Sequence, residues 1–287
     1  SVFRTGGNLV VACGSREAAQ TYARTALGFL REAVLPRPSV SMELVVTADY
    51  TCIVTLVFYD SFVDDDPAAF AFAQELRDAG GDKVVVDDVT GWTTWFEATS
   101  SLWPVIAEMK GDPLIRTDHC MGTMRGRTGP DDAVLDFVVT DWIGRMPFDL
   151  ANQSIVEIRT LGGAAAAAAA ALGSSNAQAQ AARIPAGNAQ CQFFADMIVA
   201  YDGKDRSSEE RRQIQTKVDA IVGDAKKLTA VDRNVQVDFS ATHSQPRRGC
   251  EGPELFGNKV EYESIKSIKR KVDPLNRFRC HPFGTIL

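Results

Sequence analysis

The chain has 287 residues, 45% of them apolar, and a formal net charge of -6. This is enough apolar material for one large or two modest cores, so a folded globular protein is expected. The negative charge argues against a nucleic-acid partner, because phosphate binding needs a basic surface. No stretch approaches the roughly 20 apolar residues that span a bilayer, so no membrane association is expected. The sequence opens at Ser1 without an initiator methionine or a signal-peptide core, which suggests a processed or excised chain.

Six cysteines are scattered singly along the chain, without a C-x-x-C pair or the spacing of metal ligands. No metal site is therefore expected. Buried free thiols are favoured over disulfides, because a chain of this size does not need covalent cross-links, but disulfides remain the alternative.

The first sixty residues alternate between strand and helix patterns. A short apolar strand is predicted over residues 9–12. Ser15 can then cap a helix whose apolar residues recur at helical spacing until two prolines end it. Residues 42–47 and 52–59 are rich in β-branched residues, and the short connection between them predicts an antiparallel hairpin.

A second helix is predicted over residues 67–79, and another strand begins at residue 83. The order strand, helix, two strands, helix, strand resembles a ferredoxin-like arrangement, with helices on one face of an antiparallel sheet. The aromatic segment 92–103 that follows is interpreted as core, which is the commoner fate of such clusters.

Further elements are predicted in the second half of the chain. They are strands at 154–160, 191–200 and 235–239 and helices at 209–222 and 262–271. The alanine-rich residues 162–182 have little apolar bulk to bury, so a loop or a marginal surface helix is expected there. In total, a sheet of about six or seven strands is predicted.

The C-terminus carries the most specific pattern. Residues 269–279 read K-x-K-x-D-P-x-N-x-F-R after an apolar helix. This segment is similar to the terminal motif of berberine-bridge-type FAD-linked oxidases. Three features lie upstream of this motif, in the same order as in that family. They are a strand ending in Gly162-Gly163, a strand ending at Tyr201, and residues 237–239.

The resemblance implies an α+β fold: an antiparallel sheet with helices on one face, plus a C-terminal segment that packs on a flavin domain. It assigns residues 1–230 to a substrate-binding domain and 231–287 to the C-terminal segment. The family's flavin-binding domain, with its glycine-rich pyrophosphate loop, has no counterpart in this sequence. FAD is therefore expected to be held mainly by a partner chain, in a heterodimer or a nicked chain that acts on a small organic substrate. The resemblance also implies a secreted or endomembrane location.

The resemblance also points to residues on the strand that ends at Tyr201. Counting back along it, Asp196 falls where the family has a Glu or Gln that acts as a base or positions the substrate. Phe194 and Ile198 share its face and are predicted to contact the substrate. Apolar neighbours would raise the pKa of Asp196, as a general base needs. The plainer alternative is a partly exposed or hydrogen-bonded strand residue.

Cofactor-binding candidates lie near the C-terminus. Phe239 occupies a position where many members have an active-site tyrosine, so one catalytic hydroxyl is lost if the match holds. With a shift in the count, Asn258 could serve as the family's asparagine before the last helix, and His281 could approach the cofactor edge. Glu157 and Arg159 share one strand face and either line a pocket or form a cross-strand ion pair, which is the favoured reading.

Three hypotheses follow. The first is an enzyme subunit or processed fragment that supplies the substrate pocket of an FAD-dependent oxidoreductase. The second is a non-catalytic binding or structural protein that kept the fold and lost the chemistry. The third is a free-standing ligand-binding module unrelated to flavin. A bound yellow chromophore would separate the first from the other two.

Overall fold

The computed structural model describes residues 3–37, 39–59, 66–100, 121–126, 132–160, 193–201, 206–231, 235–238 and 259–275. Its strands are β1 (Phe3–Ala12), β2 (Val40–Thr47), β3 (Thr51–Tyr59), β4 (Val84–Trp92), β5 (Met121–Gly126), β6 (Ile155–Thr160), β7 (Phe193–Ile198) and β8 (Val235–Asp238). Its α-helices are α1 (Arg16–Phe29), α2 (Asp66–Phe72), α3 (Gln74–Gly80), α4 (Trp95–Ser100), α6 (Asp132–Phe137), α10 (Ser208–Val231) and α11 (Lys259–Val272). The described residues also form two π-helical segments, η1 (Leu30–Val34) and η3 (Val138–Ile143), and a 3-10 turn, η2 (Gly81–Lys83).

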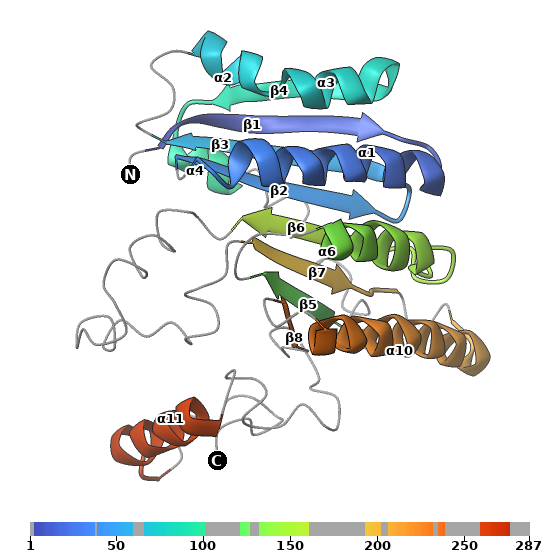
Figure 1. The fold of residues 1–287 in the computed structure, drawn as a ribbon, viewed down its shortest axis with the longest axis vertical. Helices are drawn as coiled ribbons and strands as arrows, with labels where there is room; N and C mark the ends of the chain where they lie inside the picture. Colours follow the sequence, from blue (N-terminus) through green and yellow to red (C-terminus); the bar gives the residue numbers. More distant parts are fainter. Residues whose placement is uncertain are drawn as a thin grey trace.

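The eight strands form a single sheet in the order β4-β1-β3-β2-β6-β7-β5-β8 (Figure 1). Every pair of neighbours is antiparallel. The first four strands in this order come from the N-terminal third of the chain, and the other four come from residues 121–238. Strands β2 and β6 pair at the seam between the two groups, from Glu43 opposite Arg159 to Thr47 opposite Ile155.

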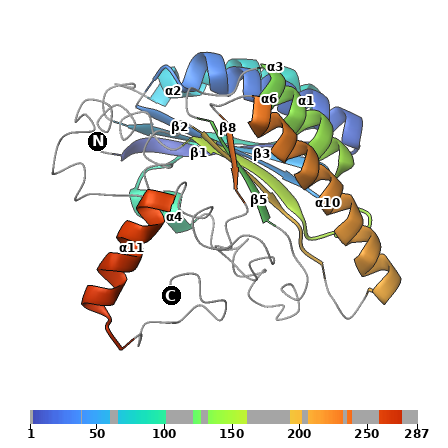
Figure 2. The same ribbon diagram turned by 60° about the horizontal axis from the view of Figure 1, so that its bottom comes forward.

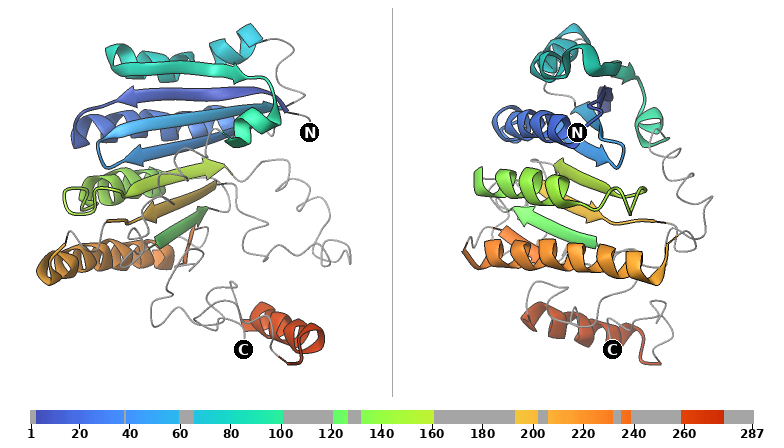
Figure 3. Two further views of the ribbon diagram at one scale, coloured as in Figure 1. Left: turned by 180° about the vertical axis from the view of Figure 1, so that it is seen from behind. Right: turned by 90° about the vertical axis from the view of Figure 1, so that its right-hand side faces the viewer.

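The helices that cover the sheet lie on one side of it. Figure 2 shows α1, α2, α3, α6 and α10 on that side, with α4 on the opposite side, and Figure 3 shows the same layering from behind and from the edge. Helix α11 stands apart from this helix layer. The predicted α+β class, with helices on one face of an antiparallel sheet, is therefore confirmed.

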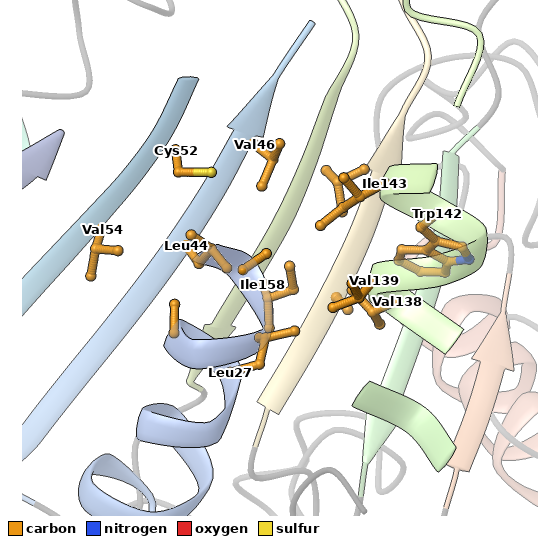
Figure 4. Close-up of a cluster of buried hydrophobic side chains, with 14 of the residues drawn as sticks. Leu27, Leu44, Val46, Cys52, Val54, Val138, Val139, Trp142, Ile143 and Ile158 are labelled. Carbon is orange, nitrogen blue, oxygen red and sulfur yellow. The ribbon is translucent and has the colours of Figure 1, made fainter. Parts of the chain in front are cut away.

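The core lies between the sheet and the helix layer. Alternate residues of β2 and β3, such as Leu44 and Val54, are fully buried against α1, as the period of two in a strand requires. Figure 4 shows Leu27 of α1 beside these strands and Trp142 of η3 on the neighbouring part of the sheet. Ser15 caps α1 as predicted, because its Oγ accepts a hydrogen bond of 3.2 Å from the main-chain N–H of Ala18.

Several predictions need correction. The sheet has eight strands rather than six or seven, and β5 was missed. The helix expected over residues 67–79 is broken into α2 and α3 near Ala73. The aromatic segment is not core where it is described, since Trp95 is 54% and Phe96 is 77% exposed. These two side chains stand on α4, away from the helix layer that would have buried them.

The alanine-rich segment 162–182 and the C-terminal residues after 275 lie outside the described residues. The proposed division at residue 230 stays a prediction, although β8, which follows it, pairs with β5 in the main sheet. No helix in the described ranges is long and apolar enough to cross a bilayer.

Candidate functional site

The side of the sheet away from α1, α6 and α10 is here called the open face. On β2 and β3 its positions alternate with the core positions and are half-buried; Glu43, Val45 and Thr55 are examples. Apolar and polar positions are interspersed on it. The open face thus offers both contact area and polar groups to whatever binds there.

The strand predicted to carry the catalytic group is β7. Asp196 pairs with Glu157 of β6 on one side and with Thr123 of β5 on the other. Phe194 pairs with Arg159 in the next row. These pairings place four of the sequence-predicted site residues in two adjacent rows of the sheet. Their substrate and catalytic roles stay predictions.

Ile198 lies one row further along β7, opposite Ile155 of β6 and Met121 of β5. It is half-buried, in contrast to its neighbour Met197, which is fully buried on the helix side. The row that contains Ile198 and Ile155 is therefore apolar where the rows with Glu157 and Arg159 are charged.

Glu157 and Arg159 form an ion pair, with Arg159 Nη1 2.9 Å from Glu157 Oε1. The pair runs along one strand rather than across two, which differs from the geometry expected. Glu157 is only 8% exposed, and among the described residues its Oε1 has no hydrogen-bond partner of good geometry. The contact with Arg159 is therefore an ion pair without good hydrogen-bond geometry. The buried Oε1 atom of Glu157 can still accept a hydrogen bond.

Glu43 is a site residue that the sequence analysis missed. On β2 it is paired with Arg159, and its neighbour Val45 is paired with Glu157, so Glu43 and Glu157 are diagonal neighbours on the open face. Burial raises the pKa of Glu43 to about 8, and a hydrogen bond with Glu157 and the charge of Glu157 add to the effect, against the opposing charge of Arg159. Glu43 is therefore mostly a neutral carboxylic acid at pH 7.

The row of polar residues that contains Glu43 continues across the neighbouring strands β3 and β1. Thr55 of β3 is the pairing partner of Glu43, and its hydroxyl donates a hydrogen bond of 2.8 Å to Asn8 Oδ1 of β1. Apolar positions such as Val45 and Ile53 occupy the next row. An uncharged polar stretch therefore leads from β1 to the carboxyl pair.

Three residues were predicted to bind the cofactor. Phe239, Asn258 and His281 all lie outside the described residues. Within the described ranges, no group of three His, Cys, Asp or Glu side chains could hold a metal ion. A shallow depression on α10, lined by Glu209, Arg212, Gln213, Thr216 and Lys217, contains none of the predicted site residues.

No protein-family model matches the chain, and no curated protein does. Solved structures do share its fold. Against BBE-like #28 from Arabidopsis thaliana the TM-score is 0.57, with 11% identity over 99% of this chain and 56% of that chain. Against 6-hydroxy-D-nicotine oxidase from Arthrobacter nicotinovorans it is 0.52, with 14% identity over 96% and 53%. Against CrmK, a flavoenzyme involved in caerulomycin biosynthesis, it is 0.50, with 14% identity over 97% and 49%.

The protein thus has the fold of part of the berberine bridge enzyme-like oxidases, which confirms the resemblance seen in its C-terminal motif. The chain spans about half the length of these solved structures. At such low identity the likeness concerns the fold.

Proposed function

We propose that this chain is a subunit or processed fragment of an FAD-dependent oxidase, in which its open face forms the substrate side of the active site. The observation that carries the proposal is the layering of the sheet. Helices α1, α2, α3, α6 and α10 cover one face, whereas the other face presents charged and apolar rows. The fold is shared with solved oxidases over nearly the whole of this chain.

The described residues do not amount to a complete FAD site. Tight binding of a dinucleotide requires a glycine-rich loop that brings main-chain N–H groups to the pyrophosphate at a helix N-terminus. The sequence has no G-x-G-x-x-G motif. The proposal therefore assigns most of the FAD contacts to another polypeptide, and this chain contributes one wall of the site.

In this proposal each row of the open face has a role. Asp196 accepts a proton from the substrate or positions it, and Phe194 and Ile198 contact its apolar part. Glu157 and Arg159 line the same pocket, where their opposite charges can orient a polar substrate. Phe239, Asn258 and His281 would approach the cofactor from the C-terminal segment.

The proposed partner is a polypeptide that carries the flavin domain, either a separate chain or the other part of a nicked one. A non-catalytic protein derived from the same fold is the alternative, and Phe239 favours it, since a phenylalanine cannot transfer a proton. A secreted or endomembrane location remains an expectation.

The proposal is tested by purifying the protein from its native source through a tag on this chain. Size-exclusion chromatography is followed at the flavin absorbance bands, and intact mass identifies each polypeptide in the peak. We expect a yellow complex with a second polypeptide and an interface above about 2,000 Å². A stable, colourless and monodisperse monomer would contradict the proposal.

A further inference from the structure

Two carboxyl groups lie on the seam between the two halves of the sheet, and the proposal above gives a role to Glu157 but none to Glu43. Glu43 belongs to β2 and Glu157 to β6, and the pairing of these strands makes the two residues diagonal neighbours on the open face. Glu157 is only 8% exposed, and Glu43 is half-buried. Two carboxylates so placed repel each other unless a proton lies between them.

We infer that Glu43 and Glu157 form a proton-sharing carboxyl pair that exchanges a proton between the open face and solvent. The charged groups around the pair favour one arrangement of that proton. On β6, the Arg159 guanidinium lies beside Glu157 and faces Glu43 across the strand pair. On β7, the pairing partner of Glu157 is Asp196. On β3, the partner of Glu43 is the uncharged Thr55.

This arrangement puts the proton on Glu43, because Arg159 forms its ion pair with Glu157, and within the described ranges no ion pair joins a cation to Glu43. The raised pKa of Glu43 agrees with this assignment. Glu157 Oε1 makes no hydrogen bond of good geometry among the described residues, although Arg159 Nη1 lies 2.9 Å from it, so it keeps the capacity to accept a hydrogen bond from a protonated group.

A singly protonated pair can pass a proton without a change in its own charge. A proton binds to a Glu157 oxygen, the O–H bond of Glu43 breaks, and the proton of Glu43 goes to water. The pair carries one proton before and after the step, so no additional charge is placed in a desolvated position. Oxidation of a substrate frees a proton at its reacting group. That the pair carries this proton away rests on the proposed function.

Infrared spectroscopy of this chain tests the pair without flavin or substrate. The carbonyl stretch of a protonated carboxyl group is followed as the pH is raised from about 5 to 10, a range that includes values well above the ordinary pKa of a glutamic acid. We expect a band that persists at pH 7, titrates near the pKa of about 8 and is absent from Glu43→Gln. Glu157→Gln should move the midpoint to lower pH, because it removes a like charge. The exposed Glu75→Gln is the matched control and should leave the band unchanged.

The absence of a protonated carboxyl at pH 7, or a band that survives in Glu43→Gln, would overturn the inference. So would an unchanged midpoint in Glu157→Gln. In the flavin-containing complex, Glu43→Gln should abolish an alkaline fall in the oxidation rate, and a pH profile unaffected by it would also count against proton exchange. A complex that oxidises no substrate would defeat the proposed function instead, and the infrared titration would still decide the pair.

Discussion

Arg16 Nη1 donates a hydrogen bond of 2.7 Å to the main-chain oxygen of Gly144, which joins the first turn of α1 to the end of η3. Its Nη2 atom donates to the main-chain oxygen of Met146 and to the hydroxyl of Tyr50, each at 3.2 Å. Tyr50 belongs to the hairpin between β2 and β3, whereas Met146 precedes β6. One side chain thus connects the two halves of the sheet away from their pairing at the seam.

Replacement of Arg16 should therefore destabilise the whole domain. A hydrogen bond that involves a charged group contributes about 1.5–3 kcal/mol. The three bonds of Arg16 share one half-buried side chain and their energies do not add, because water can replace part of what is lost. We expect Arg16→Ala to lower the free energy of unfolding by about 2–3 kcal/mol in chemical denaturation. Arg24→Ala on the same helix is the control, because its ion pair with Asp136 is solvent-exposed and is worth about 0–1 kcal/mol. Equal effects of the two variants would contradict the linking role of Arg16.

The raised pKa of Glu43 makes stability depend on pH. Between its unfolded value near 4.5 and its folded value of about 8, the native state holds a proton that the unfolded chain has released. This contribution to stability is complete below the unfolded pKa and is lost as the pH rises through the folded one. Glu43→Gln cannot ionise, so its unfolding free energy should fall less than that of the wild type between about pH 5 and 9. Denaturant titrations at several pH values measure the difference, and parallel curves would contradict it.

The sequence predicted the parts of the fold in which local pattern and tertiary environment agree. In β2 and β3, alternation of apolar residues coincides with one buried face, so the hairpin and its faces were correct. Strand β5 was missed because Met121–Gly126 contains two glycines and only one β-branched residue. Trp95 and Phe96 were wrongly assigned to the core. Aromatic residues indicate a contact surface, but the sequence does not show whether that surface is covered by the same chain or by a partner.

The sequence predicted only part of the candidate site. Alternation put Glu157 and Arg159 on one face, but it could not bring in Glu43, because the pairing of β2 with β6 is a long-range choice. The residues on β2 show the only available signal, a single glutamate among apolar and small residues at an alternating position. Its raised pKa is a consequence of tertiary burial and of Glu157, neither of which the local sequence contains.

The two described cysteines are free, and they lie close together in the core. Cys13 Sγ is 3.7 Å from Cys52 Sγ, and Cys52 is fully buried. The hydrogen bond with Cys13 and burial raise the pKa of the Cys52 thiol, so it should be unreactive toward thiol reagents until the protein unfolds. Cys52→Ser should cost about 1–3 kcal/mol because it buries a hydroxyl group, and more than Cys52→Ala. Rapid labelling of Cys52 in the native protein, followed by mass spectrometry, would argue against this environment.

The exposed aromatic side chains on α4 should matter for association more than for folding. Phe96 is 77% exposed, so Phe96→Ser should change the unfolding free energy by less than about 0.5 kcal/mol. It should also reduce binding of a hydrophobic dye and weaken association with the proposed flavin-domain polypeptide, because an exposed aromatic cluster marks an interaction surface. Phe70→Ser on α2 is the control, since α2 lies on the helix side of the sheet. A core-sized loss of stability in Phe96→Ser would show that α4 packs within the chain.

The last prediction concerns the close approach of β1 and the edge strand β4. At Gly7 a Cβ atom would lie 1.6 Å from the main-chain oxygen of Asp88, so no side chain fits without moving the backbone. The pairing of the two strands also shifts register between Gly6 and Asn8, which places Gly7 at the irregularity.

Gly7→Ala should therefore loosen β4 and cost about 1–3 kcal/mol of stability, the range for steric overpacking. Hydrogen exchange should show the loss of protection concentrated in β4, while β2 and β3 keep theirs. Gly28→Ala is the matched control. A Cβ at Gly28 meets nothing within 4 Å, and the residue lies within α1, so this variant should gain about 0.5–1 kcal/mol from helix propensity. If Gly7→Ala were as stable as the wild type, β4 could not be held against β1 in the register described.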